Sequence, residues 1–297
     1  MSATNERAVP ESTAIPSFAR ILLVTDFSAC SAAAVPFASL LAEYYRASVV
    51  VCHVIPAQAQ DGGKTPTDTA KAREVAEVRL RKFIAKSPLG EADYETAIGH
   101  GQAWDVLAAL VEEKHVDLVV LGTHGRSGVG KLLMGSVAQR IFTLAPCPVL
   151  SVSPKARKSW GAERKLARIL YATDFLPGSL KALPYALSLA RVGQAELLLL
   201  HVPESSEASS SEILQGYHQH LSALIPAEHR TWCKSDTIVT PGDPVRVILD
   251  TAARNRVDFI VIGAHGFEGS MASFQVPLSI AYRVVAHAPC PVLRVRS

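Results

Sequence analysis

The residues best suited to chemistry lie in a glycine-rich stretch near the middle of the chain, residues 118–136 (LVVLGTHGRSGVGKLLMGS). Glycine tolerates positive φ angles and lets backbone N–H groups approach a phosphate closely. Arg126 and Lys131 add positive charge to this stretch. Gly135 and Ser136 fall at the expected start of a helix, whose free N–H groups and dipole attract anions. The stretch therefore predicts a phosphate site, where the Ser136 hydroxyl could donate a hydrogen bond or bind a phosphate-bound Mg²⁺ ion.

Part of this stretch is similar to a P-loop. Residues 125–131 read GRSGVGK, which matches the first seven positions of that motif. The eighth position, where a P-loop has the Ser or Thr that binds Mg²⁺, is Leu132. The loop also follows a late strand and has no counterpart in the second half of the chain. We therefore do not predict a P-loop nucleoside triphosphatase.

Short apolar runs alternate with helical segments around this loop. We expect helices that end near residues 45, 86, 115 and 144, and strands over residues 21–25, 49–54, 94–98, 116–121 and 149–152. Strands that are apolar on both faces and alternate with helices are typical of a parallel sheet covered on both sides. The pattern predicts a doubly wound α/β domain with five parallel strands.

The whole pattern occurs twice, with a period near 145 residues. The segment APCPVL, for example, stands at residues 145–150 and again at 288–293. A repeat of this length is a domain rather than a solenoid unit, and 297 residues suffice for two domains with their own cores. We expect the following boundaries: a flexible tail over 1–19, a first domain over 20–153, a polar and basic linker over 154–166, and a second domain over 167–297.

Four candidate residues of the first domain fall at or just after the ends of different strands: Asp26, Val54, Gly101 and Gly122. In open parallel sheets, ligands bind outside the carboxyl ends of the strands, near the point where the strand order reverses. We therefore expect these residues to meet at one crevice.

The spacing Gly122-x2-Gly125-x9-Gly135-Ser136 resembles the nucleotide signature of the universal stress protein family. Asp26 after the opening strand and the closing residues 145–149 (APCPV) resemble the same family. The similarity spans residues 20–153 and again 168–296, so the chain resembles a tandem member. The resemblance implies two adenine-nucleotide-hydrolase-like domains. It also implies that they pair within the chain as an intramolecular pseudo-dimer, because single-domain members pair as dimers.

The resemblance also implies a ligand, ATP or another adenine nucleotide, bound with Mg²⁺. In ATP-binding members, residues equivalent to Asp26 contact the nucleoside, and those equivalent to Val54 contact adenine through the backbone. Gly122 and Gly125 would lie beside the ribose and the phosphates. The phosphates would be held by Gly135 and Ser136, and the candidate set is completed by Gly101, His124, Arg126 and Val137.

The second copy departs from this pattern. It keeps Asp174, Val202, Gly263 and Gly266 at equivalent positions. At the spacing of the Gly-Ser pair it has residues 276–277, Val-Pro, and proline has no N–H to donate. Where the first copy has Arg126, the second has Phe267 followed by Glu268. We predict a weak or lost phosphate site, which could still hold a nucleoside, another ligand or nothing.

Several of these residues also have a purely structural interpretation. Glycines at strand ends often make tight turns, and Asp26 could cap a helix or close an Asx turn. His53 and His201 recur at strand ends and are interpreted as structural. His124 could touch phosphate or be a solvated loop residue.

Composition excludes several classes of partner. A net charge of +3 is too small to indicate nucleic acid or an acidic membrane surface. There is no run of about 18 apolar residues for a membrane span, and the first 19 residues do not form a secretory signal. Five scattered cysteines without metal-ligand spacing are typical of a reducing cytosol. We expect a cytoplasmic protein.

The leading hypothesis for function is an ATP-binding stress-response or signalling module with an unknown protein partner and with homodimerisation left open. We do not predict an enzyme, because no residue stands out as a general base, although slow ATP hydrolysis is conceivable. An ATP-using enzyme of the adenine-nucleotide hydrolase type is disfavoured, because residues 25–31 after the first strand lack glycine. The remaining alternative is an interaction scaffold that binds no nucleotide.

Overall fold

The computed structural model describes residues 15–57, 66–91, 93–124, 134–156, 165–204, 210–264 and 279–296. Gly125, Arg126, Gly266, Phe267, Glu268 and residues 276–277 lie outside these ranges. The first half of the chain contains β1 (Arg20–Val24), α1 (Ala29–Tyr45), β2 (Ser48–Pro56), α2 (Pro66–Ala85), η2 (Pro88–Glu91), β3 (Tyr94–Gly101), α3 (Ala103–Glu113), β4 (Leu118–Gly122), α4 (Ser136–Leu144) and β5 (Val149–Val152).

The second half repeats this order with small differences around its first helix. It contains β6 (Arg168–Thr173), α6 (Pro177–Leu180), α7 (Leu183–Gly193), β7 (Glu196–His201), α8 (Ser211–Ala223), η3 (Ala227–His229), β8 (Ser235–Val239), α9 (Pro244–Arg254), β9 (Phe259–Ala264), α10 (Ile280–His287) and β10 (Val292–Arg296). No helix among these described elements is long and apolar enough to cross a membrane.

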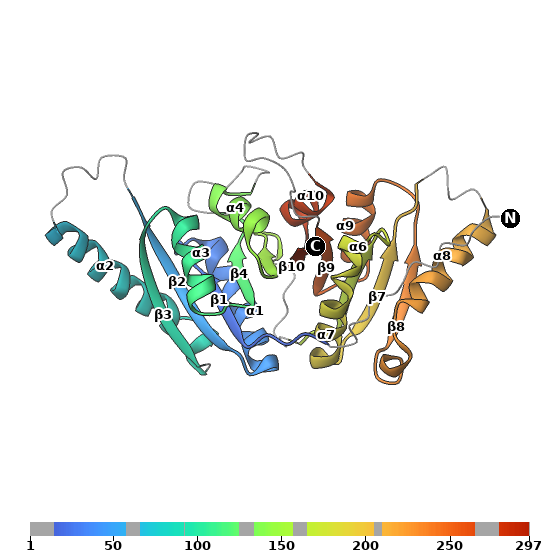
Figure 1. Cartoon of the computed structure of the whole chain (residues 1–297), viewed down its shortest axis with the longest axis horizontal. Helices are drawn as coiled ribbons and strands as arrows, with labels where there is room; N and C mark the ends of the chain where they lie inside the picture. The colour runs from blue at the N-terminus through green and yellow to red at the C-terminus, as the bar shows by residue number, and fades with distance from the viewer. Residues whose placement is uncertain are drawn as a thin grey trace.

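The described strands form one ten-stranded sheet in the order β3-β2-β1-β4-β5-β10-β9-β6-β7-β8. All strand pairs within each half are parallel, which confirms the prediction of two five-stranded units. The halves meet where β5 and β10 pair antiparallel, with Leu150 opposite Leu293. Figure 1 shows β10 at the centre of the molecule, with the edge strands β3 and β8 on opposite sides. The intramolecular pseudo-dimer is therefore a single continuous sheet.

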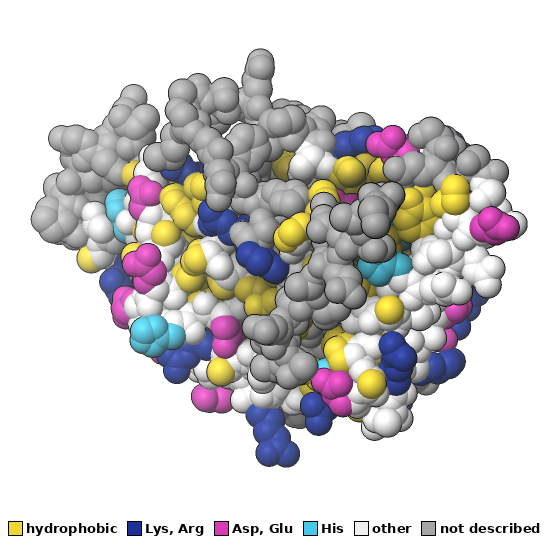
Figure 2. Space-filling view, turned by 45° about the vertical axis from the view of Figure 1, so that its right-hand side comes forward, with side chains coloured by type: hydrophobic (Ala, Val, Ile, Leu, Met, Phe, Trp, Pro, Cys, Tyr) yellow, Lys and Arg dark blue, Asp and Glu magenta, His cyan; other side chains and the backbone are white. Residues whose placement is uncertain are grey.

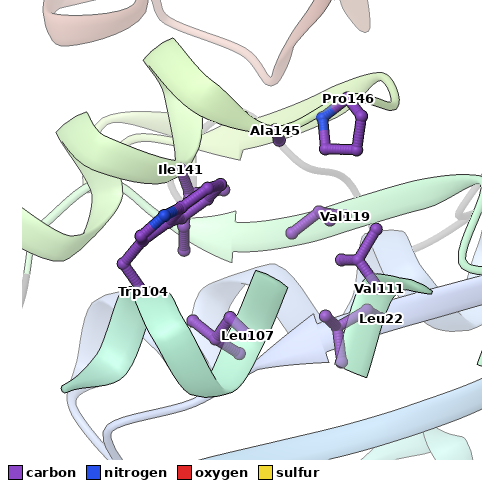
Figure 3. A pocket seen from close by; sticks show the side chains of 8 residues that line it. All are labelled: Leu22, Trp104, Leu107, Val111, Val119, Ile141, Ala145 and Pro146. Carbon is purple, nitrogen blue, oxygen red and sulfur yellow. The ribbon is translucent and has the colours of Figure 1, made fainter. Parts of the chain in front are cut away.

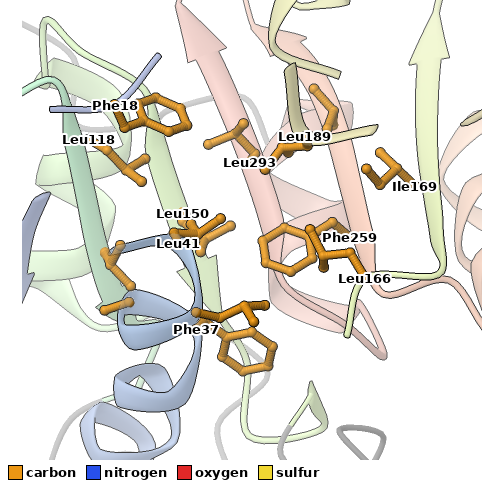
Figure 4. Packing of buried hydrophobic residues seen from close by; sticks show 14 of the residues in the cluster. Phe18, Phe37, Leu41, Leu118, Leu150, Leu166, Ile169, Leu189, Phe259 and Leu293 are labelled. Atoms are coloured by element: carbon orange, nitrogen blue, oxygen red, sulfur yellow. The ribbon is translucent and has the colours of Figure 1, made fainter. Parts of the chain in front are cut away.

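Alternate residues of each strand face opposite sides of the sheet, so two apolar layers form. Ile21 and Leu23 belong to the layer covered by α1, α2, α7 and α8, and Leu22 belongs to the layer covered by α3, α4, α9 and α10. Both layers continue across the boundary between the halves. Phe37 of α1 contacts Phe259 of β9 edge to face, with ring centroids 5.8 Å apart (Figure 4). The two domains consequently share their cores.

The segment before β1 is part of this shared core. Phe18 is 2% exposed and packs between Tyr45 of the first domain and Tyr185 of the second. The sequence placed this residue in a tail over 1–19, so the ordered fold begins earlier than the tail boundary implied. Phe18 is separated from the apolar run at residues 21–24 and is preceded by Pro16 and Ser17, so it gave no periodic signal. The ends of the expected linker are also packed, because Ala156 and Leu166 are fully buried.

A hydrogen bond across the domain boundary allows a first prediction. The Tyr45 hydroxyl lies 2.7 Å from Ser188 Oγ, and burial raises the pKa of this phenol well above its usual range. We expect Tyr45→Phe to lower the free energy of unfolding by about 1 kcal/mol, the usual net value of such a bond. Urea unfolding measures this loss. In a double-mutant cycle with Ser188→Ala, strictly additive effects would contradict a direct interaction.

Candidate functional site

A cavity of about 430 Å³ opens at the carboxyl ends of β1, β2 and β4. The chain winds outward from β1 through β2 to β3 and then returns to β4 on the other side of β1, so the cavity lies where the strand order reverses. Its volume is within the usual range for small-molecule sites. The cavity brings together seven of the ten candidate residues of the first domain: Asp26, Val54, Gly122, His124, Gly135, Ser136 and Val137.

The three other candidates are placed differently. Gly101 ends β3 with φ of +127° and is not among the residues that line the cavity. Its conformation suits glycine because a side chain rarely adopts it. Gly125 and Arg126 lie outside the described residues, so their predicted contacts with phosphate stay predictions.

The start of α4 forms one wall of this cavity. Gly135 is the N-cap residue, and having no side chain it cannot cap the helix. Its own N–H donates to the Thr123 carbonyl at 2.9 Å, and its carbonyl accepts from Gln139 N at 2.8 Å. Within the described part of the chain, the N–H groups of Ser136, Val137 and Ala138 have no acceptor. The helix therefore points unsatisfied donors and the positive end of its dipole at the cavity.

Backbone groups of β2 form the opposite part of the site. Thr25 N donates to the Cys52 carbonyl at 2.9 Å, so the backbone N–H and C=O groups of Cys52 point toward β1. The backbone groups of successive strand residues point alternately toward the two neighbouring strands. Those of Val54 therefore point the same way as those of Cys52, at a level where β1 has already ended. On the other edge, Ala57 N bonds to Gly101 O of β3, which agrees with this alternation. Val54 thus presents one N–H and one C=O to the cavity it lines.

Asp26 lies between these two parts. Its Oδ1 accepts from Ser28 N at 2.9 Å, so the carboxylate closes an Asx turn while it lines the cavity. Ser28 then caps α1 by accepting from Ser31 N. The structural interpretation of Asp26 is therefore correct, and it coexists with a position at the site. A carboxylate held in this way could accept hydrogen bonds from ligand hydroxyls.

Gly122 has a packing role that is independent of any ligand. A Cβ atom at this position would lie 2.7 Å from the backbone C and O atoms of Cys30 and 2.8 Å from the Ser31 nitrogen. Only glycine lets the end of β4 approach the start of α1 so closely. Gly263 is constrained in the same way by the backbone of Gly178 and Ser179. This glycine is therefore expected in both copies whether or not they bind a ligand.

The cavity also contains residues that the sequence did not assign to the site. They include Thr25, Ser31, Pro56, Ala103, Leu107 and Ala138. The position of α3 directly after β3, whose end faces the same crevice, was the available signal for Ala103 and Leu107. His53 lines the cavity as well, with Nδ1 2.8 Å from the Thr25 carbonyl. His201 makes the same contact with Thr173 O at 2.9 Å, which favours a structural role for both.

A second cavity beneath the site, between α3, α4 and the sheet, is apolar and much smaller, about 10 Å³ (Figure 3). Its lining includes Trp104 and Ile141, and a single indole N–H offers too few polar partners to fix a water molecule. It is a packing defect rather than a ligand site.

The thiols near the site are unsuited to nucleophilic chemistry. Burial raises the pKa of Cys30, which lies behind Gly122, and raises that of Cys52 to about 12. Both thiols therefore stay protonated at neutral pH. The described residues also contain no group of three or more His, Cys, Asp or Glu side chains able to hold a metal ion. On the face shown in Figure 2, basic side chains lie among acidic ones rather than in one patch.

The helix of the second domain that corresponds to α4 begins at a different residue from the predicted one. Counting from Gly266 placed residues 276–277 at the helix start, but α10 begins at Ile280 and its N-cap is Ser279. The alignment was wrong because the loop before α10 is longer than the loop before α4. Ser279 Oγ accepts from Tyr282 N at 3.2 Å, so this helix start is capped by its own side chain. The prediction that the second domain lacks a phosphate site therefore rests on Ser279 rather than on proline.

Other candidates in the second domain are also engaged within the fold. Asp174 Oδ1 accepts from Leu176 N at 3.0 Å and from the Ser179 hydroxyl. Arg283, one turn into α10, lies 3.8 Å from the Asp243 carboxylate at the start of α9. Val202 is half-buried after β7, and Gly263 presses against α6.

Comparison with known proteins gives a consistent result over both halves. The sequence model of the universal stress protein family matches residues 17–153 and 165–296. A universal stress protein of Mycolicibacterium smegmatis is 26% identical over an alignment of 304 residues, which covers 93% of this chain and 96% of the relative. One from Methanocaldococcus jannaschii is 28% identical over 139 residues, covering 46% of this chain and 82% of the relative.

Solved structures agree on the fold. The crystal structure of a universal stress protein from Archaeoglobus fulgidus superposes with a TM-score of 0.70 at 20% identity, covering 93% of this chain and 98% of that chain. At this level of identity the match shows the fold alone. The double match of the family model confirms the tandem arrangement expected from the repeat.

Proposed function

We propose, on the premise that the chain belongs to the universal stress protein family, that its first domain binds an adenine nucleotide and its second domain binds no polyphosphate. The observation that carries this proposal is the uncapped start of α4 at the wall of a cavity of about 430 Å³. Three backbone N–H groups without acceptors in the described structure favour an anion there. A nucleotide is favoured over a free phosphate because the cavity extends to β2.

The remaining parts of the cavity suit the other parts of a nucleotide. The N–H and C=O of Val54 match the acceptor and donor that adenine presents along one edge. Leu107 and Ile141 add apolar surface for a purine ring. The Asp26 carboxylate can accept hydrogen bonds from ribose hydroxyls. The donors of α4 would then hold the phosphates.

Magnesium would be held mainly by the phosphates in this arrangement. Mg²⁺ in nucleotide sites usually keeps several waters and takes only one or two protein ligands. The Ser136 hydroxyl at the helix start is the protein ligand available beside the phosphate position. The Ser136 hydroxyl could supply one ligand to Mg²⁺ in addition to the phosphates and waters. We therefore expect nucleotide binding to depend only partly on Mg²⁺.

The biochemical role that fits these features is a nucleotide-dependent stress-response or signalling module in the cytoplasm. Nucleotide binding would stabilise one arrangement of α4 and so change a surface available to a protein partner. We do not propose an enzyme, because the cavity-lining groups that could act as bases, Asp26, His53 and His124, each make a hydrogen bond within the fold. A nucleotide-independent scaffold is the competing function, and nucleotide binding separates the two.

The proposal is tested by identifying and titrating the ligand. Mass spectrometry of small molecules released from freshly purified, denatured protein should detect an adenine nucleotide. Calorimetric titration of nucleotide-free protein with ATP and Mg²⁺ should give one site per chain, with AMP and GTP as comparisons. Two equal sites would contradict the asymmetry between the domains. No binding of any nucleotide would favour the scaffold, and steady product release would favour a hydrolase.

A further inference from the structure

The last strand of each domain reaches the C-terminal end of the other domain's last helix. In the second domain, Arg296 Nη1 donates to the Leu144 carbonyl at 3.1 Å, and Arg294 Nη1 lies 3.5 Å from the Ala145 carbonyl. These carbonyls end α4. In the first domain, Ser153 Oγ donates to the Ala288 carbonyl at 2.7 Å, which ends α10. The two domains therefore cap each other's helices across the β5–β10 pair.

The groups with which the two domains cap each other's helices differ in charge. By the repeat, Ser151 of β5 and Ser153 directly after it occupy the positions of Arg294 and Arg296 of β10. The helix α4 thus receives two guanidinium groups, whereas α10 receives one neutral hydroxyl. Cations near a helix C-terminus stabilise the helix by interacting with the last carbonyls and with the negative end of the dipole.

Arg294 is buried against α4. Its side chain is 1% exposed, and its guanidinium carbon lies 5.4 Å above the ring of Phe142, a residue of α4. Phe142 in turn contacts Tyr282 of α10 edge to face, with centroids 6.2 Å apart. Burial and the neighbouring Arg296 charge lower the pKa of Arg294 to about 10, so the group remains protonated at neutral pH.

The helix that these arginines cap is the one that lines the cavity. It has nine residues, and helices this short depend on tertiary packing for their stability. At 1.5 Å per residue, the capped C-terminus is only about 14 Å from the N-terminus that faces the cavity. Fixing one end of such a short helix therefore restricts the orientation of the N–H groups at the other.

We propose that Arg294 and Arg296 of the second domain are positioning residues for the nucleotide site of the first domain. This inference rests on the proposed function. Both arginines act through α4: they hold its C-terminal end in place, so the N–H groups of Ser136, Val137 and Ala138 are preorganised for phosphate before it binds. The second domain would then be retained as a support for the site of the first rather than as a second binding domain.

The test uses the full-length double variant Arg294→Met/Arg296→Gln. Methionine keeps an apolar stem against Phe142, and replacing a buried charge by an apolar residue is often neutral for stability. We expect the dissociation constant for ATP to rise about 5- to 10-fold, a typical coupling between distant groups. In the absence of nucleotide, amide hydrogen exchange over residues 136–144 should become faster. Restoring one charge with Arg296→Lys in place of Gln should recover part of the affinity.

Ser153→Ala is the matched control, because it removes the reciprocal cap on α10 and leaves α4 untouched. It should leave ATP affinity unchanged. Equal weakening by Ser153→Ala, or unchanged exchange of α4 in the double variant, would overturn the positioning role. Failure of the wild-type protein to bind nucleotide would instead overturn the proposed function, and the exchange data distinguish the two failures. If the double variant does not fold, the exposed single variant Arg296→Gln carries the same expectations with a smaller effect.

Discussion

Gly135→Asp is expected to abolish ATP binding and to leave the fold intact. Gly135 is the N-cap of α4 and has φ of −61° and ψ of 150°, which any residue can adopt. An aspartate there would accept from an N–H group of the first turn, as Ser279 accepts from Tyr282 N at α10. It would also place a negative charge where the phosphates are proposed to bind. Juxtaposed like charges cost several kcal/mol, so we expect affinity to fall by about 100-fold or more.

Calorimetry measures the affinity, and urea unfolding measures the stability of the same variant. A new N-cap in place of glycine should raise the free energy of unfolding by only a few tenths of a kcal/mol, but it should not lower it, so lost binding could not be attributed to unfolding. Gly135→Ser separates the two effects, because it caps the helix without adding charge and should weaken binding less. If Gly135→Asp binds ATP as the wild type does, the phosphates are not at this helix start.

Gly122→Ala is expected to be strongly destabilising, although it adds a single methyl group. The added Cβ would lie 2.7–2.8 Å from backbone atoms of Cys30 and Ser31, which cannot move aside as a side-chain tip could. Overpacking of a tight core contact typically costs 1–3 kcal/mol, and we expect about 3 kcal/mol here. The substitution should lower the urea midpoint.

Two further glycines serve as controls for this prediction. Gly263→Ala should be at least as destabilising, because its Cβ would lie 2.1 Å from the Gly178 carbonyl oxygen. Gly216 lies within α8, and a Cβ added there would have no neighbouring atom within 4 Å, so Gly216→Ala should stabilise the protein by about 0.5–1 kcal/mol. If Gly122→Ala unfolds at the wild-type urea midpoint, the close packing of β4 on α1 is not what requires glycine.

The architecture of each domain could be predicted because its signals are local. Runs such as residues 118–121 are apolar on both faces, and helices with caps and periodic apolar positions separate them. That combination leaves few arrangements other than a parallel sheet between two helical layers. The repeat then extended the prediction to the second domain without new assumptions.

The pairing of the two domains was expected only through the family resemblance, and the strands that form it, β5 and β10, were not predicted. Both strands are short apolar runs, and nothing in either sequence specifies an antiparallel partner more than 140 residues away. The same limitation hid the contacts of Phe18 and of the arginines of β10, because each depends on an element from the other domain. Arg294 is a charged residue in an apolar run, and its burial follows only once α4 is placed beside β10.

The candidate site was predictable where residues sit at strand ends and less so where loop length matters. Asp26, Val54 and Gly122 lie at or near strand ends, and the topology alone brings such residues to one cavity. The start of α10 was misplaced because a fixed count was carried across a loop of different length. The correction keeps a contrast between the domains, since Ser279 occupies one first-turn donor of α10, whereas no side chain occupies a first-turn donor of α4.

A crystal structure of the wild-type protein grown with ATP and Mg²⁺ tests the central claim most directly. We predict phosphate oxygens within about 3.2 Å of the backbone nitrogens of Ser136, Val137 or Ala138, and no phosphate at the Ser279-capped start of α10. Phosphates bound away from α4, or bound equally at both helix starts, would contradict the account.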